Sequence, residues 1–180
     1  MTTSREDAAT DPLGPGLRAA RLASWGPVTE RAAHLGHKLV DRFERDPGYP
    51  FVNTKLSILT GEDFPTPADD RMDFKGKTAI FGWIQGRGLE ALAGHARWLD
   101  RCRVLTAPER RDLARRTTAM VAAVTESLER LRERVGGHLA FLMTPDGRPF
   151  DLDEVSRERR YLANIPDRST MSDLFHAKGL

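Results

Sequence analysis

One segment of the sequence, residues 77–101, most constrains the fold, because it is apolar on nearly every side and also rich in glycine. A helix that is apolar all round must be enclosed by other elements rather than lie on a surface. Each interior glycine costs on the order of 1 kcal/mol relative to alanine, so packing has to offset this cost. Glycine suits positions where another backbone or a ligand comes close. The apolar residues are Ile80, Phe81, Trp83, Ile84, Leu89 and Leu92, and the glycines are Gly82, Gly86, Gly88 and Gly94.

Two more helices are predicted on either side of this segment. A helix over about 28–45 follows Pro27, which suits an early helical position. A helix over about 107–135 follows Thr106 and Glu109, which have the spacing of a capping box, and a pair of glycines ends it. Its apolar seam is Leu113, Thr117, Met120, Val124, Leu128, Leu131 and Val135.

The last third of the chain predicts a hairpin and a short helix. Two weakly alternating runs within 138–152 flank Pro145-Asp146-Gly147, a strong turn signal, and indicate a β-hairpin. A charged connector over 153–160 follows it. Ser172 is the predicted cap of a helix that begins at about residue 172. The sequence therefore predicts an all-α domain over 17–180 with one hairpin, after a flexible leader over 1–16.

Composition excludes several classes of function. The 180 residues suit one domain, and 39% hydrophobic and 30% charged residues are an ordinary globular balance. The net charge is only +2, and acidic residues interleave the arginine-rich stretches, so we expect no nucleic-acid interface. No apolar run is long enough to span a membrane, and the N-terminus lacks the apolar core of a signal peptide. We expect a cytoplasmic protein without a membrane partner.

The sequence shows no sign of a metal or cofactor site. Cys102 is the single cysteine, so no internal disulfide can form, and a buried thiol is expected. Five acidic residues between 62 and 73 lack the spacing of a calcium loop and indicate a solvated loop. These are Glu62, Asp63, Asp69, Asp70 and Asp73.

Arg87 is the main candidate for a functional residue. It lies in the apolar segment, where an unpaired buried charge would cost several kcal/mol. Glu90 at i+3 offers an ordinary helical ion pair, and Trp83 at i−4 offers its ring face. The other interpretation is that Arg87 points into a cavity and donates to a ligand oxygen. Periodicity leaves both open.

Three stretches, in this order, resemble the N-acylglucosamine 2-epimerase family. Residues 81–93, with Trp83, Gln85 and Arg87, are similar to that family's W-x-Q-x-R helix. Residues 136–151 resemble its glycine-pair hairpin, and 172–180 resemble the start of its next helix. The resemblance implies the N-terminal portion of an (α/α)6 barrel that is incomplete in this chain. It implies a carbohydrate substrate bound by Arg87 and Trp83, with His176 facing the pocket.

The same resemblance implies a sugar 2-epimerase or aldose–ketose isomerase that moves a proton beside the sugar carbonyl. Two histidines act as acid and base in that family, and no metal or redox cofactor is implied. Those histidines belong to later helices, and none of the five histidines here stands at a matching position. The expectation is thus an N-terminal fragment without catalytic residues of its own, inactive by itself.

Two other functions are compatible with the pattern. The apolar seam of 107–135 has heptad-like spacing, so the chain is alternatively a non-catalytic helical interaction module that forms a homodimer. A glycoside hydrolase on an α/α barrel is the other alternative, and it needs two facing carboxylates. Glu90 and Asp173 are the candidates for that pair.

Overall fold

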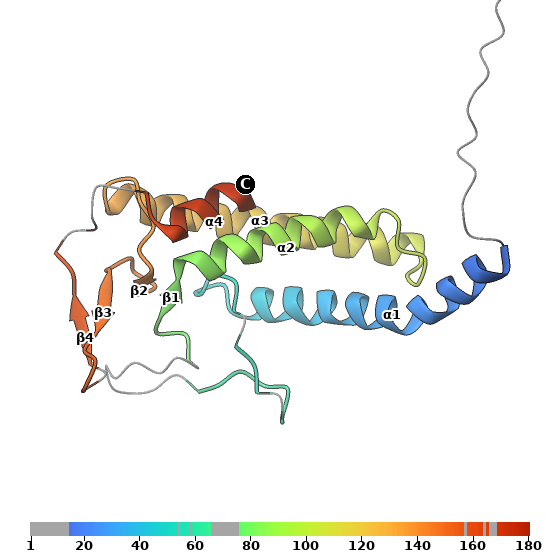
Figure 1. Cartoon of the computed structure of the whole chain (residues 1–180), viewed down its shortest axis with the longest axis horizontal. Coiled ribbons are helices and arrows are strands. Elements are labelled where there is room, and N and C mark those ends of the chain that lie inside the picture. The colour runs from blue at the N-terminus through green and yellow to red at the C-terminus, as the bar shows by residue number, and fades with distance from the viewer. Residues whose placement is uncertain are drawn as a thin grey trace, which may run out of the picture.

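A computed structural model describes residues 15–53, 55–57, 59–65, 76–156, 158–163, 165 and 169–180. Within these residues the chain forms four helices and two sheets of two strands each (Figure 1). The helices are α1 (Pro15–Arg45), α2 (Gly82–Leu99), α3 (Ala107–Arg134) and α4 (Met171–Gly179). The strands are β1 (Ile80–Phe81), β2 (Leu142–Met143), β3 (Phe150–Leu152) and β4 (Arg159–Tyr161). The predicted, mainly helical class is confirmed.

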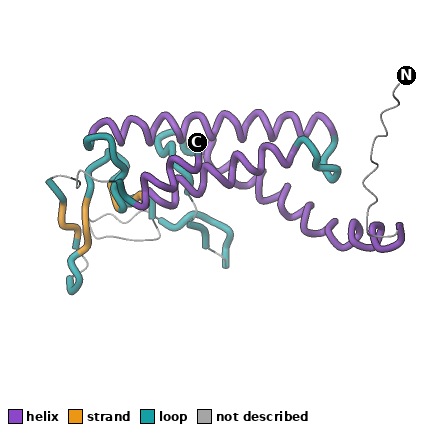
Figure 2. Tube along the Cα trace, turned by 45° about the horizontal axis from the view of Figure 1, so that its top comes forward, coloured by secondary structure: helices purple, strands orange, loops and turns teal. Residues whose placement is uncertain are grey.

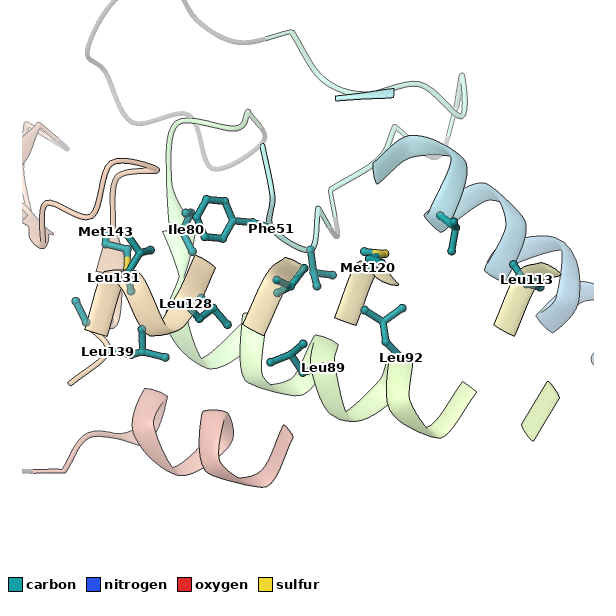
Figure 3. Close-up of a cluster of buried hydrophobic side chains, with 14 of the residues drawn as sticks. Phe51, Ile80, Leu89, Leu92, Leu113, Met120, Leu128, Leu131, Leu139 and Met143 are labelled. Carbon is teal, nitrogen blue, oxygen red and sulfur yellow. The ribbon is translucent and has the colours of Figure 1, made fainter. Parts of the chain in front are cut away.

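The core forms where α2 and α3 pack against each other. The α3 seam from Leu113 to Leu131 is buried, and it faces Leu89 and Leu92 of α2 (Figure 3). Phe51, from the loop after α1, packs into the same cluster. Because the seam is already buried within the chain, it is not available to pair with a second copy. The expected homodimer through this seam therefore loses its basis.

The ends of α3 follow the predicted local signals. The Thr106 backbone N–H donates to a Glu109 carboxylate oxygen at 2.7 Å, and the Glu109 N–H donates to the Thr106 hydroxyl, so the capping box is formed. At the other end Gly136 and Gly137 have φ angles of 80° and 89°, in the left-handed region that glycine favours. Both ends are thus set by the chemistry of residues next to them in the sequence.

Helix α1 begins earlier than its sequence predicts. It extends from Pro15 and passes through Pro27, where the prediction placed its start. A proline inside a helix removes one backbone hydrogen bond and favours a bend, and the axis of α1 bends in its N-terminal half (Figure 2). The leader predicted over 1–16 was wrong for residues 15 and 16, and residues 1–14 lie outside the described part.

The strands pair differently from the predicted hairpin. β2 pairs antiparallel with β1, whose two residues lie in the segment predicted as helix from 77, so α2 begins later, at Gly82. β3 pairs with β4, whose residues 159 and 160 were predicted as connector. A bridge between Met143 and Pro149 joins the two arms of the predicted hairpin. The hairpin is thus formed only next to its turn, and the rest of each arm pairs with another strand, because weak alternation does not specify a partner.

The turn between those arms was correctly predicted. The Gly147 N–H donates to the Thr144 carbonyl at 2.9 Å, and the Thr144 N–H donates to the Arg148 carbonyl at 3.0 Å. Gly147 has a φ of 92°, which a side-chain-bearing residue rarely adopts. The turn is specified locally, whereas the strand partners depend on tertiary packing.

Helix α4 lies along α2, and its cap is Thr170 rather than Ser172. The Thr170 hydroxyl accepts from the Asp173 N–H, and the Asp173 carboxylate accepts from the Thr170 N–H, a reciprocal capping box. Ser172 is instead buried against Gly82 of α2. The short strands gather at the end of the helices where α2 begins (Figure 1).

Candidate functional site

The contact between α2 and α4 depends on glycine. A Cβ atom on Gly82 would lie less than 3.0 Å from the Ser172 side chain of α4, and one on Gly86 would lie less than 3.0 Å from the Phe175 backbone of α4. A Cβ on Gly179 of α4 would likewise meet the Gly86 carbonyl oxygen. The expectation that glycines in this segment admit a second backbone is confirmed here.

This close approach brings Arg87 and Trp83 to Phe175. The ring centroids of Trp83 and Phe175 are 6.2 Å apart, and the Arg87 guanidinium carbon lies 5.6 Å from the centroid of the Phe175 ring. Among the described residues the guanidinium has no hydrogen-bond partner. The indole Nε1 of Trp83 is buried and also lacks one within that part of the chain. Two aromatic rings and one uncommitted guanidinium therefore share a single face, which we call the Arg87 face.

Arg87 is exposed, whereas the sequence predicted a helix enclosed by other elements and left Arg87 open between an ion pair and a cavity. The buried residues of α2 lie on the side that faces α3 and α4, so this helix is not covered all round. The expected alternative, an ion pair with Glu90, is not formed either. Glu90 pairs with Lys178 of α4 at 3.0 Å. The segment looks apolar all round because two of its sides pack on neighbours and a third carries half-buried aromatic rings.

His176 does not join the Arg87 face. Its side chain is buried between the helices, and its Nε2 lies 2.6 Å from a carboxylate oxygen of Glu129 on α3. Its Nδ1 is buried without a partner among the described residues. The hydrogen bond from His176 and the nearby Arg132 hold the pKa of the Glu129 carboxyl below its usual range. The arrangement is that of a structural link between α3 and α4, rather than a pocket-facing ligand group.

Two carboxylates nominated for a hydrolase are also engaged elsewhere. Asp173 accepts from the backbone N–H groups of Leu139 and Thr170, at 2.7 and 2.8 Å, and its Oδ2 lies 3.0 Å from His138 Nδ1. Burial would raise the pKa of Asp173, yet these donors outweigh it and hold the pKa below its usual range. Since Glu90 pairs with Lys178, neither carboxylate is placed as an acid or a nucleophile.

Gln85, named in the sequence only as part of the W-x-Q-x-R resemblance, and Phe175, which was not predicted, also contribute. The Gln85 side-chain amide accepts from the Val52 N–H at 2.8 Å and donates to the Val52 carbonyl at 3.0 Å, which ties the loop after α1 to α2. A polar amide in an apolar helix was the available signal for Gln85. No signal marked Phe175, because its role depends on the Gly86 contact.

The described residues provide no assembled metal site. No group of three histidine, cysteine, aspartate or glutamate side chains lies close enough among them to hold a metal ion. Asp63 of the predicted acidic loop instead pairs with Arg42 and Lys77, and Asp69, Asp70 and Asp73 lie outside the described part. Cys102 is buried, as expected. Within the described part of the chain, no helix has the length and apolarity needed to cross a bilayer.

No family model, no curated protein and no solved structure matches the chain. The contacts of the Arg87 face are therefore the observations on which its function has to be inferred.

Proposed function

We propose that the chain supplies the substrate-binding part of a sugar 2-epimerase or aldose–ketose isomerase, with Arg87 as the group that binds a substrate oxygen. The observation that carries the proposal is the guanidinium of Arg87, held over Phe175 and beside Trp83 with no hydrogen-bond partner among the described residues. The resemblance of residues 81–93 to the W-x-Q-x-R helix assigns the same residue.

The chemistry of the face suits a sugar. An aromatic ring accepts the apolar C–H side of a sugar ring, while a planar guanidinium donates two parallel N–H groups to neighbouring oxygens. When a proton leaves the carbon beside a carbonyl, negative charge develops on the oxygen, and a fixed cation there lowers the barrier.

The proton transfer itself needs an acid and a base that titrate near neutral pH. Among the described residues, His176 is engaged with Glu129 and His138 with Asp173, and His95 packs on Trp98. His34 and His37 lie on α1. The proposal therefore assigns the acid and base to histidines of an additional protein layer that covers the Arg87 face, in a completed (α/α)6 barrel. In this arrangement Arg87 binds and orients the substrate.

Sugar binding by this chain alone is expected to be weak, because the face is exposed and water competes for the same donors. A dissociation constant in the millimolar range corresponds to about −4 kcal/mol, which one guanidinium and one aromatic ring can supply. Titration of a ¹⁵N-labelled chain with an aldohexose and with an N-acetylhexosamine tests this. The indole N–H of Trp83, assigned with Trp83→Phe, is the reporter.

We expect saturable shifts of the Trp83 indole signal in the native chain and their loss in Arg87→Ala. Arg97→Ala is the matched control, because Arg97 is an exposed arginine of the same helix. Both variants should keep the native circular dichroism spectrum. Shifts that persist unchanged in Arg87→Ala would remove Arg87 from the proposed site.

A further inference from the structure

A cavity of about 680 Å³ lies where the end of α3 meets the turn over 144–147. Small-molecule sites typically have volumes of about 300–1,000 Å³. Its polar wall consists of Arg134, His138, Asp146 and Arg148, and Pro149 and Ile165 contribute to its apolar wall. None of these residues belongs to the Arg87 face, so a ligand of this cavity would be independent of the proposed sugar site.

Two arginines of this cavity converge on one residue. Arg134 Nη1 donates to the Asp146 backbone carbonyl, and Arg148 Nε donates to the Asp146 carboxylate, each at 3.1 Å. The Arg148 guanidinium also stacks over the Tyr161 ring, with its carbon 4.7 Å from the centroid. The other N–H groups of both guanidiniums make no hydrogen bond within the described part of the chain. Both guanidiniums are thus held by contacts within the chain and still have N–H groups that can donate to a ligand.

The turn holds this arrangement against α3. A Cβ atom on Gly147 would lie less than 3.0 Å from Leu131 of α3, so the turn sits directly on the helix. Gly147 has a φ of 92°, which favours glycine and fixes the direction in which Asp146 leaves the turn. The turn that carries Asp146 and Arg148 is therefore held against the helix that carries Arg134.

The electrostatic balance of the cavity favours an anion. The C-terminal end of a helix carries partial negative charge, which would oppose an anion near α3. At this end Arg132 covers the Gly137 carbonyl, to which its Nε and Nη2 donate at 3.2 and 3.0 Å, while its Nη1 pairs with Glu129. In the wall itself, two arginines face a single carboxylate, that of Asp146. One positive charge is left uncompensated, and His138 is already engaged with Asp173.

We propose that this cavity binds the phosphate group of a small molecule, held between Arg134 and Arg148. Guanidinium groups bind phosphate by paired, charge-assisted hydrogen bonds. A tetrahedral phosphate presents its oxygens in several directions, so it can accept from two guanidiniums that approach from different elements, whereas the two oxygens of a carboxylate lie in one plane. The shared chemistry is the phosphate, whether free or attached to a small molecule.

Isothermal titration calorimetry in a phosphate-free buffer of low ionic strength tests the proposal. The probes are inorganic phosphate, a hexose 6-phosphate and the uncharged hexose. We expect saturable binding of one equivalent of each phosphate-bearing probe by the Arg87→Ala variant, which lacks the proposed sugar site, and no competition from the hexose. Tighter binding of the hexose 6-phosphate identifies a phosphorylated molecule as the ligand, whereas equal affinity identifies the phosphate group alone.

Variants assign the binding to this cavity. Arg148→Gln and Arg134→Gln should each weaken binding by about tenfold, the loss of one charge-assisted contact. The Arg148 side chain is 63% exposed, so its replacement should leave the fold intact even if Arg134→Gln does not. Arg97→Gln is the charge-matched control and should change the affinity by less than about twofold. No saturable binding at millimolar probe, or an equal loss in Arg97→Gln, overturns the proposal.

Discussion

The side-chain amide of Gln85 occupies both backbone hydrogen-bonding groups of Val52, as donor at 3.0 Å and as acceptor at 2.8 Å. Gln85 and Val52 are both buried, with 3% and 5% of their surfaces exposed. The amide thus replaces a strand partner for a loop residue that has none, and it holds the loop after α1 on α2.

Gln85→Leu should therefore destabilise the chain by about 2–4 kcal/mol, since it leaves a buried N–H and a buried C=O unpaired. Urea unfolding, followed by circular dichroism, measures the change. Arg97→Leu removes a polar side chain from the exposed side of the same helix and should change the free energy of unfolding by less than about 0.5 kcal/mol. Equal effects of the two would show that the Val52 contact contributes nothing.

Gly86→Ala should separate α4 from α2. The added Cβ would meet the backbone of Phe175, which cannot move aside as a flexible side chain can, so we expect a loss of about 1–3 kcal/mol. Gly94 lies in the same helix with nothing within 4 Å of its Cβ position. Gly94→Ala should stabilise the chain by about 0.5–1 kcal/mol, so thermal melts of the two variants should shift in opposite directions. A neutral Gly86→Ala would contradict the close packing.

Asp173 should contribute stability that is lost in acid. Its folded-state pKa lies below its ordinary value of 3.8, so the unfolded chain takes up the proton first as the pH falls. The stabilisation is therefore fully present above about pH 4 and disappears as the pH falls through the folded-state pKa. Asp173→Asn should cost about 1–2 kcal/mol at pH 7, because the neutral amide accepts more weakly from Leu139 and Thr170.

The same substitution should flatten the acid part of the stability profile, measured by urea unfolding at a series of pH values. Asp100→Asn, which changes one exposed carboxylate, is the control and should leave the profile parallel to that of the native chain. Parallel profiles for both variants would show that Asp173 does not carry this pH dependence.

Arg116 should hold α1 on α3. Its guanidinium carries hydrogen bonds to Glu44 at 2.6 Å and Asp41 at 2.5 Å, both on α1, and the contact with Arg116 lowers the pKa of Glu44. The carboxylates are about half exposed, so the network is worth only about 1 kcal/mol. Arg116→Gln should accordingly raise amide hydrogen exchange in the C-terminal half of α1 more than in α2. Arg115→Gln removes an arginine whose ion pair lies within α3 and should leave exchange in α1 unchanged.

Features set by neighbouring residues were predictable from the sequence. The capping box of Thr106 and Glu109, the left-handed glycines after α3 and the turn at Gly147 each depend on chemistry within a few residues. The buried seam of α3 was predictable because helical periodicity identifies one apolar side. The glycines of α2 also indicated a close backbone neighbour, although they did not identify it as α4.

Tertiary structure determined which segments pair as strands and which side of each helix is covered. β2 pairs with β1, which lies far from it in the sequence. A short apolar run does not indicate which strand it will pair with. Arg87 is exposed because α4 packs on another side of α2. His176 is buried because its imidazole lies between the helices and contacts Glu129 of α3. Local sequence determines hydrogen bonds and periodicity within a few residues, whereas the side of a helix that is covered depends on distant segments.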